Sequence, residues 1–263
     1  MAALAIPVLA GAGWMAAFGA PPHYALTNLA ALAVMSLWVM FGQGPHTALS
    51  RYMLFWALVA VMLSAVLIGP ELTSATGHRV ARWFPFGTLP LHSGMIAAPA
   101  IAVLAARNRK YGALFLVLAG LLAYLQPDAA TGFALTFAAV GIYHVKRDWK
   151  IGLATIVLFV ASIVMALRGE IAPQPFVERA LVEAAGQNIA VALLLAGALL
   201  ASFLLILFAV PLSREKRFAL GGALFGFVTM SIMNNYPTPL IGYGAAPIIG
   251  FGLALGLHRI PQR

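Results

Sequence analysis

The 263-residue sequence predicts an all-α, polytopic integral membrane protein with about ten transmembrane helices. Composition is the first observation behind this prediction, because 62% of the residues are hydrophobic and only 9% are charged, whereas about a quarter of the residues of a soluble domain are charged. The second is that apolar runs near the roughly 20-residue length of a spanning helix recur along the chain. No linker or repeat separates them, so we expect a single transmembrane domain over residues 1–263.

Each apolar run predicts one helix. The runs cover approximately residues 3–20, 25–42, 52–69, 90–106, 111–126, 129–145, 151–167, 189–211, 218–233 and 240–257. The first is Ala-rich and ends like a signal-peptide cleavage region, but no Lys or Arg precedes it, so we expect an uncleaved helix. Prolines and glycines crowd residues 237–250, which predicts that the last helix is kinked or broken.

The connections between these runs alternate in charge. One set carries 12 of the 16 basic residues and only two carboxylates, a net charge of about +10, and the other set has a net charge of about −1. Lys and Arg accumulate in the cytoplasmic connections of membrane proteins. We therefore expect both termini in the cytoplasm, and we expect the overall charge of +9 to reflect orientation rather than a nucleic-acid partner.

Several kinds of chemistry lack their usual sequence patterns. The chain contains no cysteine, which excludes disulfides and thiol catalysis. Its six histidines are scattered, and neither a His-Glu-x-x-His motif nor a serine-hydrolase or nucleotide-binding loop is present. We expect no metal site and no cofactor.

Four polar segments, residues 77–87, 126–132, 168–188 and 234–244, fall in connections expected on the outer side. In the first, Arg79 and Arg82 would share one face if the stretch were helical, as a phosphate or diphosphate clamp requires. Alternatively, these two arginines pair with carboxylates on the outer side or with lipid headgroups. The neighbouring Trp83 is either a substrate contact or part of an interfacial aromatic belt.

The other outer segments hold the remaining candidate residues. Because hydrocarbon tolerates a carboxylate poorly, Asp128 either lines a wet cavity or caps the sixth helix, and the two roles are compatible. The 168–188 loop contains three glutamates that are candidate general bases: Glu170, Glu178 and Glu183. The alternative for the last two is a short surface helix from Phe176 to Ala185, with both carboxylates in water.

These motifs resemble those of the SEDS family, the RodA/FtsW-like proteins of bacterial cell shape, division and sporulation. The similarity runs from about Arg51 to Leu257 and preserves the order of four motifs. The family's Gln-Pro-Asp-Leu-Gly-Thr turn, its Arg-Trp pair, its Glu-Glu-Leu-Gly and its Pro-Leu-Pro-Phe-Val-Ser-Tyr-Gly-Gly stretch are similar to residues 126–131, 82–83, 183–186 and 237–244.

The resemblance implies a ten-helix protein of the bacterial cytoplasmic (inner) membrane. It also implies glycosyl transfer from a lipid-linked peptidoglycan precursor, a class B penicillin-binding protein or another envelope membrane protein as partner, and a polyprenyl-diphosphate lipid as ligand. From the residue chemistry and the resemblance together, the residues that we expect to bind substrate are Arg79, Arg82, Trp83, Gln126, Asp128 and Tyr243.

The sequence departs from the family at the residues that carry catalysis. Gly94 stands where the family has a glutamate, no lysine follows in that span, and Pro175 takes the place of the aspartate considered catalytic. The loop that holds this aspartate is long in the family and about twenty residues here. Catalysis by one of the three loop glutamates therefore stays an open question.

Three functions are compatible with these observations. The first is a divergent SEDS-like protein that binds lipid diphosphate or acts as a scaffold without polymerising. The second is an active lipid-linked glycosyltransferase. The third is a flippase or transporter, which the broken last helix favours and the scarcity of polar residues within the spans opposes.

Overall fold

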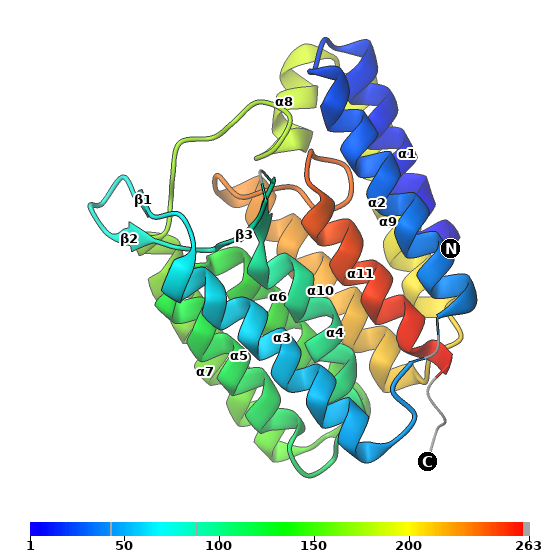
Figure 1. The fold of residues 1–263 in the computed structure, drawn as a ribbon, viewed down its shortest axis with the longest axis vertical. Coiled ribbons are helices and arrows are strands. Elements are labelled where there is room, and N and C mark those ends of the chain that lie inside the picture. Colours follow the sequence, from blue (N-terminus) through cyan, green and yellow to red (C-terminus); the bar gives the residue numbers. More distant parts are fainter. Residues whose placement is uncertain (43, 88, 260–263) are drawn as a thin grey trace.

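The computed structural model describes residues 1–42, 44–87 and 89–259, which form a helical bundle with two short hairpins at one end (Figure 1). The helices are α1 (Ala2–Ala17), α2 (Pro22–Phe41), α3 (Ala48–Ile68), α4 (Ser93–Arg107), α5 (Gly112–Leu125), α6 (Ala129–Lys146), α7 (Trp149–Arg168), α8 (Ala180–Gln187), α9 (Ile189–Phe208), α10 (Arg214–Met233) and α11 (Ala245–Gly256). The strands are β1 (Leu72–Thr73), β2 (Arg79–Val80), β3 (Trp83–Phe86) and β4 (Leu89–His92).

All ten predicted spans correspond to helices in the described residues, and the short α8 is the additional one. Four helices, α2, α3, α7 and α9, are long and apolar enough to cross a membrane, with mean hydropathies of 1.7 to 2.8. Four further apolar helices, α1, α4, α5 and α11, are shorter. The all-α membrane-protein class predicted from the sequence is thus confirmed.

Burial divides the bundle into inner and outer helices. In α4, residues 93–106 are buried without exception, and most of α6 and α11 is also buried. The long helices α2, α3, α7 and α9 instead expose large apolar side chains such as Leu67, Leu167 and Phe208. An apolar outer surface of this kind is what lipid chains cover in a membrane.

Small residues allow the inner helices to approach closely. A Cβ added to Gly222 or Gly226 of α10 would meet the backbone carbonyls of Phe137 and Phe133 of α6, at 2.2 and 2.4 Å. Backbone contact at this distance requires glycine on one side, as is typical of packed membrane helices. This contact holds α6 against α10 along most of their length.

The segment after α3 forms two antiparallel hairpins rather than a helix. Leu72 pairs with Val80, and Trp83 pairs with His92. Prolines 85 and 90 lie in the second hairpin and oppose helix formation there. The condition under which Arg79 and Arg82 would share a helix face is therefore not met.

Two other sequence predictions are changed by the structure. The last helix is shorter than expected rather than broken, since α10 ends at Met233, residues 234–244 are irregular, and α11 runs continuously from Ala245 to Gly256. Pro237 and Pro239 in this segment lack the backbone donors that a helix needs. The short helix expected from Phe176 to Ala185 exists as α8 but begins four residues later, so that Glu178 precedes it.

Candidate functional site

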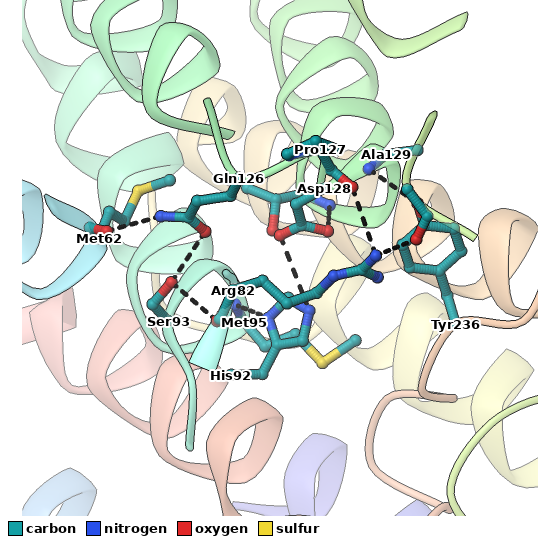
Figure 2. Close-up of polar contacts among 12 residues, drawn as sticks. Met62, Arg82, His92, Ser93, Met95, Gln126, Pro127, Asp128, Ala129 and Tyr236 are labelled. Atoms are coloured by element: carbon teal, nitrogen blue, oxygen red, sulfur yellow. Dashed lines mark hydrogen bonds and ion pairs between the residues drawn. The ribbon is translucent and has the colours of Figure 1, made fainter. Parts of the chain in front are cut away.

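The Gln-Pro-Asp turn joins α5 to α6 and is buried. Asp128 is the N-cap of α6, and its Oδ1 accepts a hydrogen bond from the Thr131 backbone at 3.2 Å. The neighbouring Gln126 donates to the Met62 carbonyl of α3 and accepts from the Ser93 hydroxyl of α4 (Figure 2). The capping role predicted for Asp128 is confirmed, and the amide of Gln126 connects three helices.

Arg82 is fully buried beside this turn. Its guanidinium donates to the backbone carbonyls of Pro127 and Gly169 and lies 4.7 Å from the ring centroid of Tyr236 (Figure 2). A buried guanidinium needs such acceptors, because desolvation without them is costly. Arg82 thus joins the hairpin region to α5, α7 and the irregular 234–244 segment.

His92 lies beside the carboxylate of Asp128, although no motif in the sequence selects this histidine. Its Nδ1 accepts a hydrogen bond from the Met95 backbone at 3.3 Å, so a neutral ring carries its proton on Nε2. That Nε2 faces Oδ2 of Asp128 at 3.7 Å (Figure 2). The carboxylate therefore orients the imidazole. Only the fold brings residues 92 and 128 together.

Gly94 explains how α4 comes so close to this carboxylate. A Cβ at this position would lie 1.8 Å from Thr131 Oγ1 and 2.7 Å from Asp128 Oδ2. Any side chain would push α4 away from α6. Where the family resemblance implies a glutamate, this chain instead has a close helix contact and a His92–Asp128 pair.

The polar cluster around this contact retains unused hydrogen-bonding capacity. Within the described residues, the buried atoms without a hydrogen-bond partner include Arg82 Nε and Nη1, His92 Nε2, Asp128 Oδ2 and Thr131 Oγ1. Buried polar atoms are nearly always satisfied in folded proteins, by protein, water or ligand. Hydrogen bonding within this buried cluster is therefore incomplete among the described residues.

His92 also forms part of the wall of a cleft of about 300 Å³ at the end of the bundle predicted to face outwards. Three residues selected from the sequence line this cleft: Trp83, Glu178 and Tyr243. The remaining wall is mostly apolar and includes Leu91, Met95 and Val177. An apolar cleft with a few polar groups is typical of a small-molecule or lipid site.

Glu178 is the loop glutamate that reaches the cleft. It is 5% exposed, and its Oε2 accepts a hydrogen bond from the Gln174 backbone at 2.7 Å. Burial raises the pKa of Glu178 to about 7, against the opposing effects of backbone hydrogen bonds and the Arg82 charge. The alternative that placed this carboxylate in water is wrong, because the residue precedes α8 and turns inwards.

Three other candidate residues, Arg79, Glu183 and Glu170, are not among the described residues that line the cleft. Arg79 is exposed and forms an ion pair with Glu71 at 2.5 Å, the alternative that the sequence left open. Glu183 Oε2 accepts a hydrogen bond from the Phe176 backbone at 2.7 Å. The backbone carbonyl of Glu170 accepts a hydrogen bond from the Ala75 backbone N–H.

The shortened 168–188 loop is fastened to the 234–244 segment. Glu178 and Pro237 form an isolated β-bridge, and the Thr238 hydroxyl accepts from the Ala180 backbone at 2.8 Å. The Tyr243 backbone donates to the Phe176 carbonyl at 2.6 Å, and its ring stacks on Tyr24 with 3.7 Å between centroids. These contacts hold two walls of the cleft in a defined position.

The fold and this cleft define a polytopic helical membrane protein with a candidate binding site at one end of its bundle. One solved structure with the same fold is the crystal structure of the Thermus thermophilus rod shape determining protein RodA. It has a TM-score of 0.69 and 18% sequence identity, and the match covers 98% of this chain and 94% of that one. The SEDS-like fold expected from the sequence motifs is confirmed. No family model and no curated protein sequence matches the chain.

Proposed function

We propose that this protein is a SEDS-like membrane protein of the bacterial cell envelope that binds a polyprenyl-diphosphate lipid without polymerising it. The observation that carries the proposal is the mostly apolar cleft, lined by His92, Glu178 and Tyr243, in a RodA-like fold. The apolar wall suits the first part of a prenyl chain. The diphosphate would face His92, with Arg82 supplying positive charge from behind the wall.

The substitutions at the family's catalytic positions favour binding over polymerisation. Pro175 has no group that can take a proton from an acceptor hydroxyl, and Gly94 removes a second carboxylate. A positioned general base typically contributes about 10²–10⁴ in rate. The loop that would carry the base is short and is bonded to the 234–244 segment instead.

The test is the binding of polyprenyl diphosphate to the purified protein in nanodiscs. We expect saturable binding that Tyr243→Ala weakens about tenfold, because the substitution removes one aromatic wall of the cleft. Tyr124→Ala is the matched control, since this exposed tyrosine contacts Arg168 and is not among the cleft-lining residues. Binding that is absent, or that both variants weaken equally, would contradict the proposal.

The position of Glu178 favours a second function, an active lipid-linked glycosyltransferase with this carboxylate as general base. A pKa of about 7 suits a group that must accept a proton near neutral pH. Incubation with lipid-linked sugar separates the two functions. Turnover that Glu178→Gln reduces by about 10²–10⁴ and Glu183→Gln leaves unchanged supports the enzyme, whereas binding without turnover supports the first proposal.

We also propose a partner in the membrane, either a class B penicillin-binding protein or another envelope protein. The support is the RodA-like fold together with the implication of the sequence motifs. Co-purification of the tagged protein from membranes, with an unrelated ten-helix protein as control, tests it. Recovery of the same envelope proteins with both baits would contradict this expectation.

A further inference from the structure

Two adjoining cavities lie at the opposite end of the bundle, the end predicted to face the cytoplasm. Their volumes are about 270 and 830 Å³, and Arg107 and Arg109 line both of them. Neither cavity belongs to the outer cleft, whose lining they do not share.

Basic side chains from five segments converge on these cavities. They are Arg51 of α3, Arg107 of α4, Arg109 of the following loop, Lys146 of α6 and Lys216 of α10. The lining also includes two carboxylates, Asp148 and Glu215, so that the described residues leave an excess of three positive charges.

Both carboxylates already have hydrogen-bond partners of their own. Asp148 Oδ1 accepts from the Lys150 backbone at 2.9 Å, and Glu215 Oε1 accepts from the Ser213 hydroxyl at 2.7 Å. Neither of these hydrogen bonds joins a carboxylate to a basic side chain of the lining. Among the described lining residues, basic groups therefore remain in excess of carboxylates.

The burial of Lys216 and the partial burial of Lys146 distinguish this cluster from an ordinary solvated face. Lys216 is only 6% exposed, and the ammonium group of the half-buried Lys146 donates to the Ala106 carbonyl at the end of α4. A long basic side chain that serves solubility extends into water. Holding like charges close together, with one of them buried, is costly unless an anion is bound among them.

We propose that these two cavities bind a phosphate-bearing anion. Guanidinium groups bind phosphate oxygens through paired hydrogen bonds, and basic pockets between membrane helices hold phospholipid headgroups. The start of α10 at Arg214 adds the positive end of a helix dipole at the larger cavity. A headgroup entering from the cytoplasmic leaflet and a free phosphate ester present the same chemistry. This site is independent of the function proposed for the outer cleft.

The experiment uses the full-length protein in phosphatidylcholine nanodiscs, with either phosphatidylglycerol incorporated or inorganic phosphate added. Retained lipid is measured by native mass spectrometry, and phosphate binding by thermal unfolding. The cavity variants are Arg109→Gln and Lys216→Gln, and the controls are Arg214→Gln and Lys150→Gln, which remove an exposed charge at the same end. Each cavity variant should weaken binding about fivefold.

Retention of phosphatidylglycerol that the cavity variants reduce and the controls do not identifies a lipid headgroup as the ligand. The same pattern with inorganic phosphate alone identifies a soluble phosphate. Equal effects of cavity and control variants, or no preference for either probe over phosphatidylcholine, would overturn the proposal. Arg109 is exposed, so Arg109→Gln decides the question even where Lys216→Gln fails to fold, and Lys216→Arg should restore binding.

Discussion

The two ends of the bundle bury their charged side chains differently. At the end predicted to face outwards, the buried Arg82 donates to two backbone carbonyls (Figure 2). At the other end, Lys216, which is 6% exposed, lies among further basic groups. This difference agrees with the proposal that the basic cluster at this second end binds an anion, whereas the contacts of Arg82 stabilise the fold itself.

At the end that holds the cleft, the polar residues fall into two groups, those that connect helices and those that face the cleft. Gln126, Asp128 and Arg82 connect helices, and their removal should damage the fold before it affects any ligand. His92 and Glu178 face the cleft and are the residues through which a ligand would be recognised. Four measurements test this difference between the two ends.

The largest effect is expected for Arg82→Ala. The substitution leaves the carbonyls of Pro127 and Gly169 without this donor and opens a cavity, which should lower the free energy of unfolding by about 4 kcal/mol. Arg79→Ala is the matched control, because its exposed ion pair contributes less than about 1 kcal/mol. Denaturant unfolding in micelles measures both, and similar losses would contradict a structural role for Arg82.

The second effect is a pH dependence that arises from Glu178. Because burial raises its pKa from 4.5 to about 7, the folded protein keeps a proton that the unfolded chain releases. Stability should therefore fall as the pH rises from about 4.5 to about 7, by up to about 3 kcal/mol.

Unfolding curves across this range, recorded for the Glu178→Gln variant, check the assignment. The decline should be largely absent in this variant and retained in Glu183→Gln, which alters a neighbouring glutamate of the same loop. A decline of equal size in Glu178→Gln and the unchanged protein would show that another group is responsible.

The third effect concerns the helix contact at Gly94. Gly94→Ala places a methyl group 1.8 Å from Thr131 Oγ1 and should cost about 2 kcal/mol of stability. Gly13→Ala on α1 is the control, since no atom lies within 4 Å of its added Cβ. Thr131→Ala in the Gly94→Ala background should recover part of the loss. Additive effects in this double-mutant cycle would argue against the contact.

The smallest effect is expected at the inner end and has the opposite sign. Lys216→Met should raise stability by about 1 kcal/mol in anion-free detergent, because it removes a buried charge from a cluster of like charges. Lys150→Met, which removes an exposed charge, should change little. The gain in stability should shrink when phosphate is added. A loss of stability in the absence of any anion would show that the basic cluster at the two cavities needs no bound anion.

Several features follow from the sequence by itself. The ten helices, the irregular 234–244 segment and the cap at Asp128 depend on hydrophobic run length, proline and local capping chemistry. The signals for these features lie within about twenty neighbouring residues. The order of the SEDS-like motifs also anticipated the fold that the RodA structure shares.

The tertiary structure decided which polar residues meet. His92 and Asp128 are 36 positions apart, Glu178 forms a bridge with Pro237, and Lys216 reaches a cavity formed by residues of other helices. No local pattern encodes such contacts, because they depend on how closely α4 approaches α6 and on how the shortened loop folds back. Side-chain burial, and with it the raised pKa of Glu178, follows from this packing and not from residue type alone.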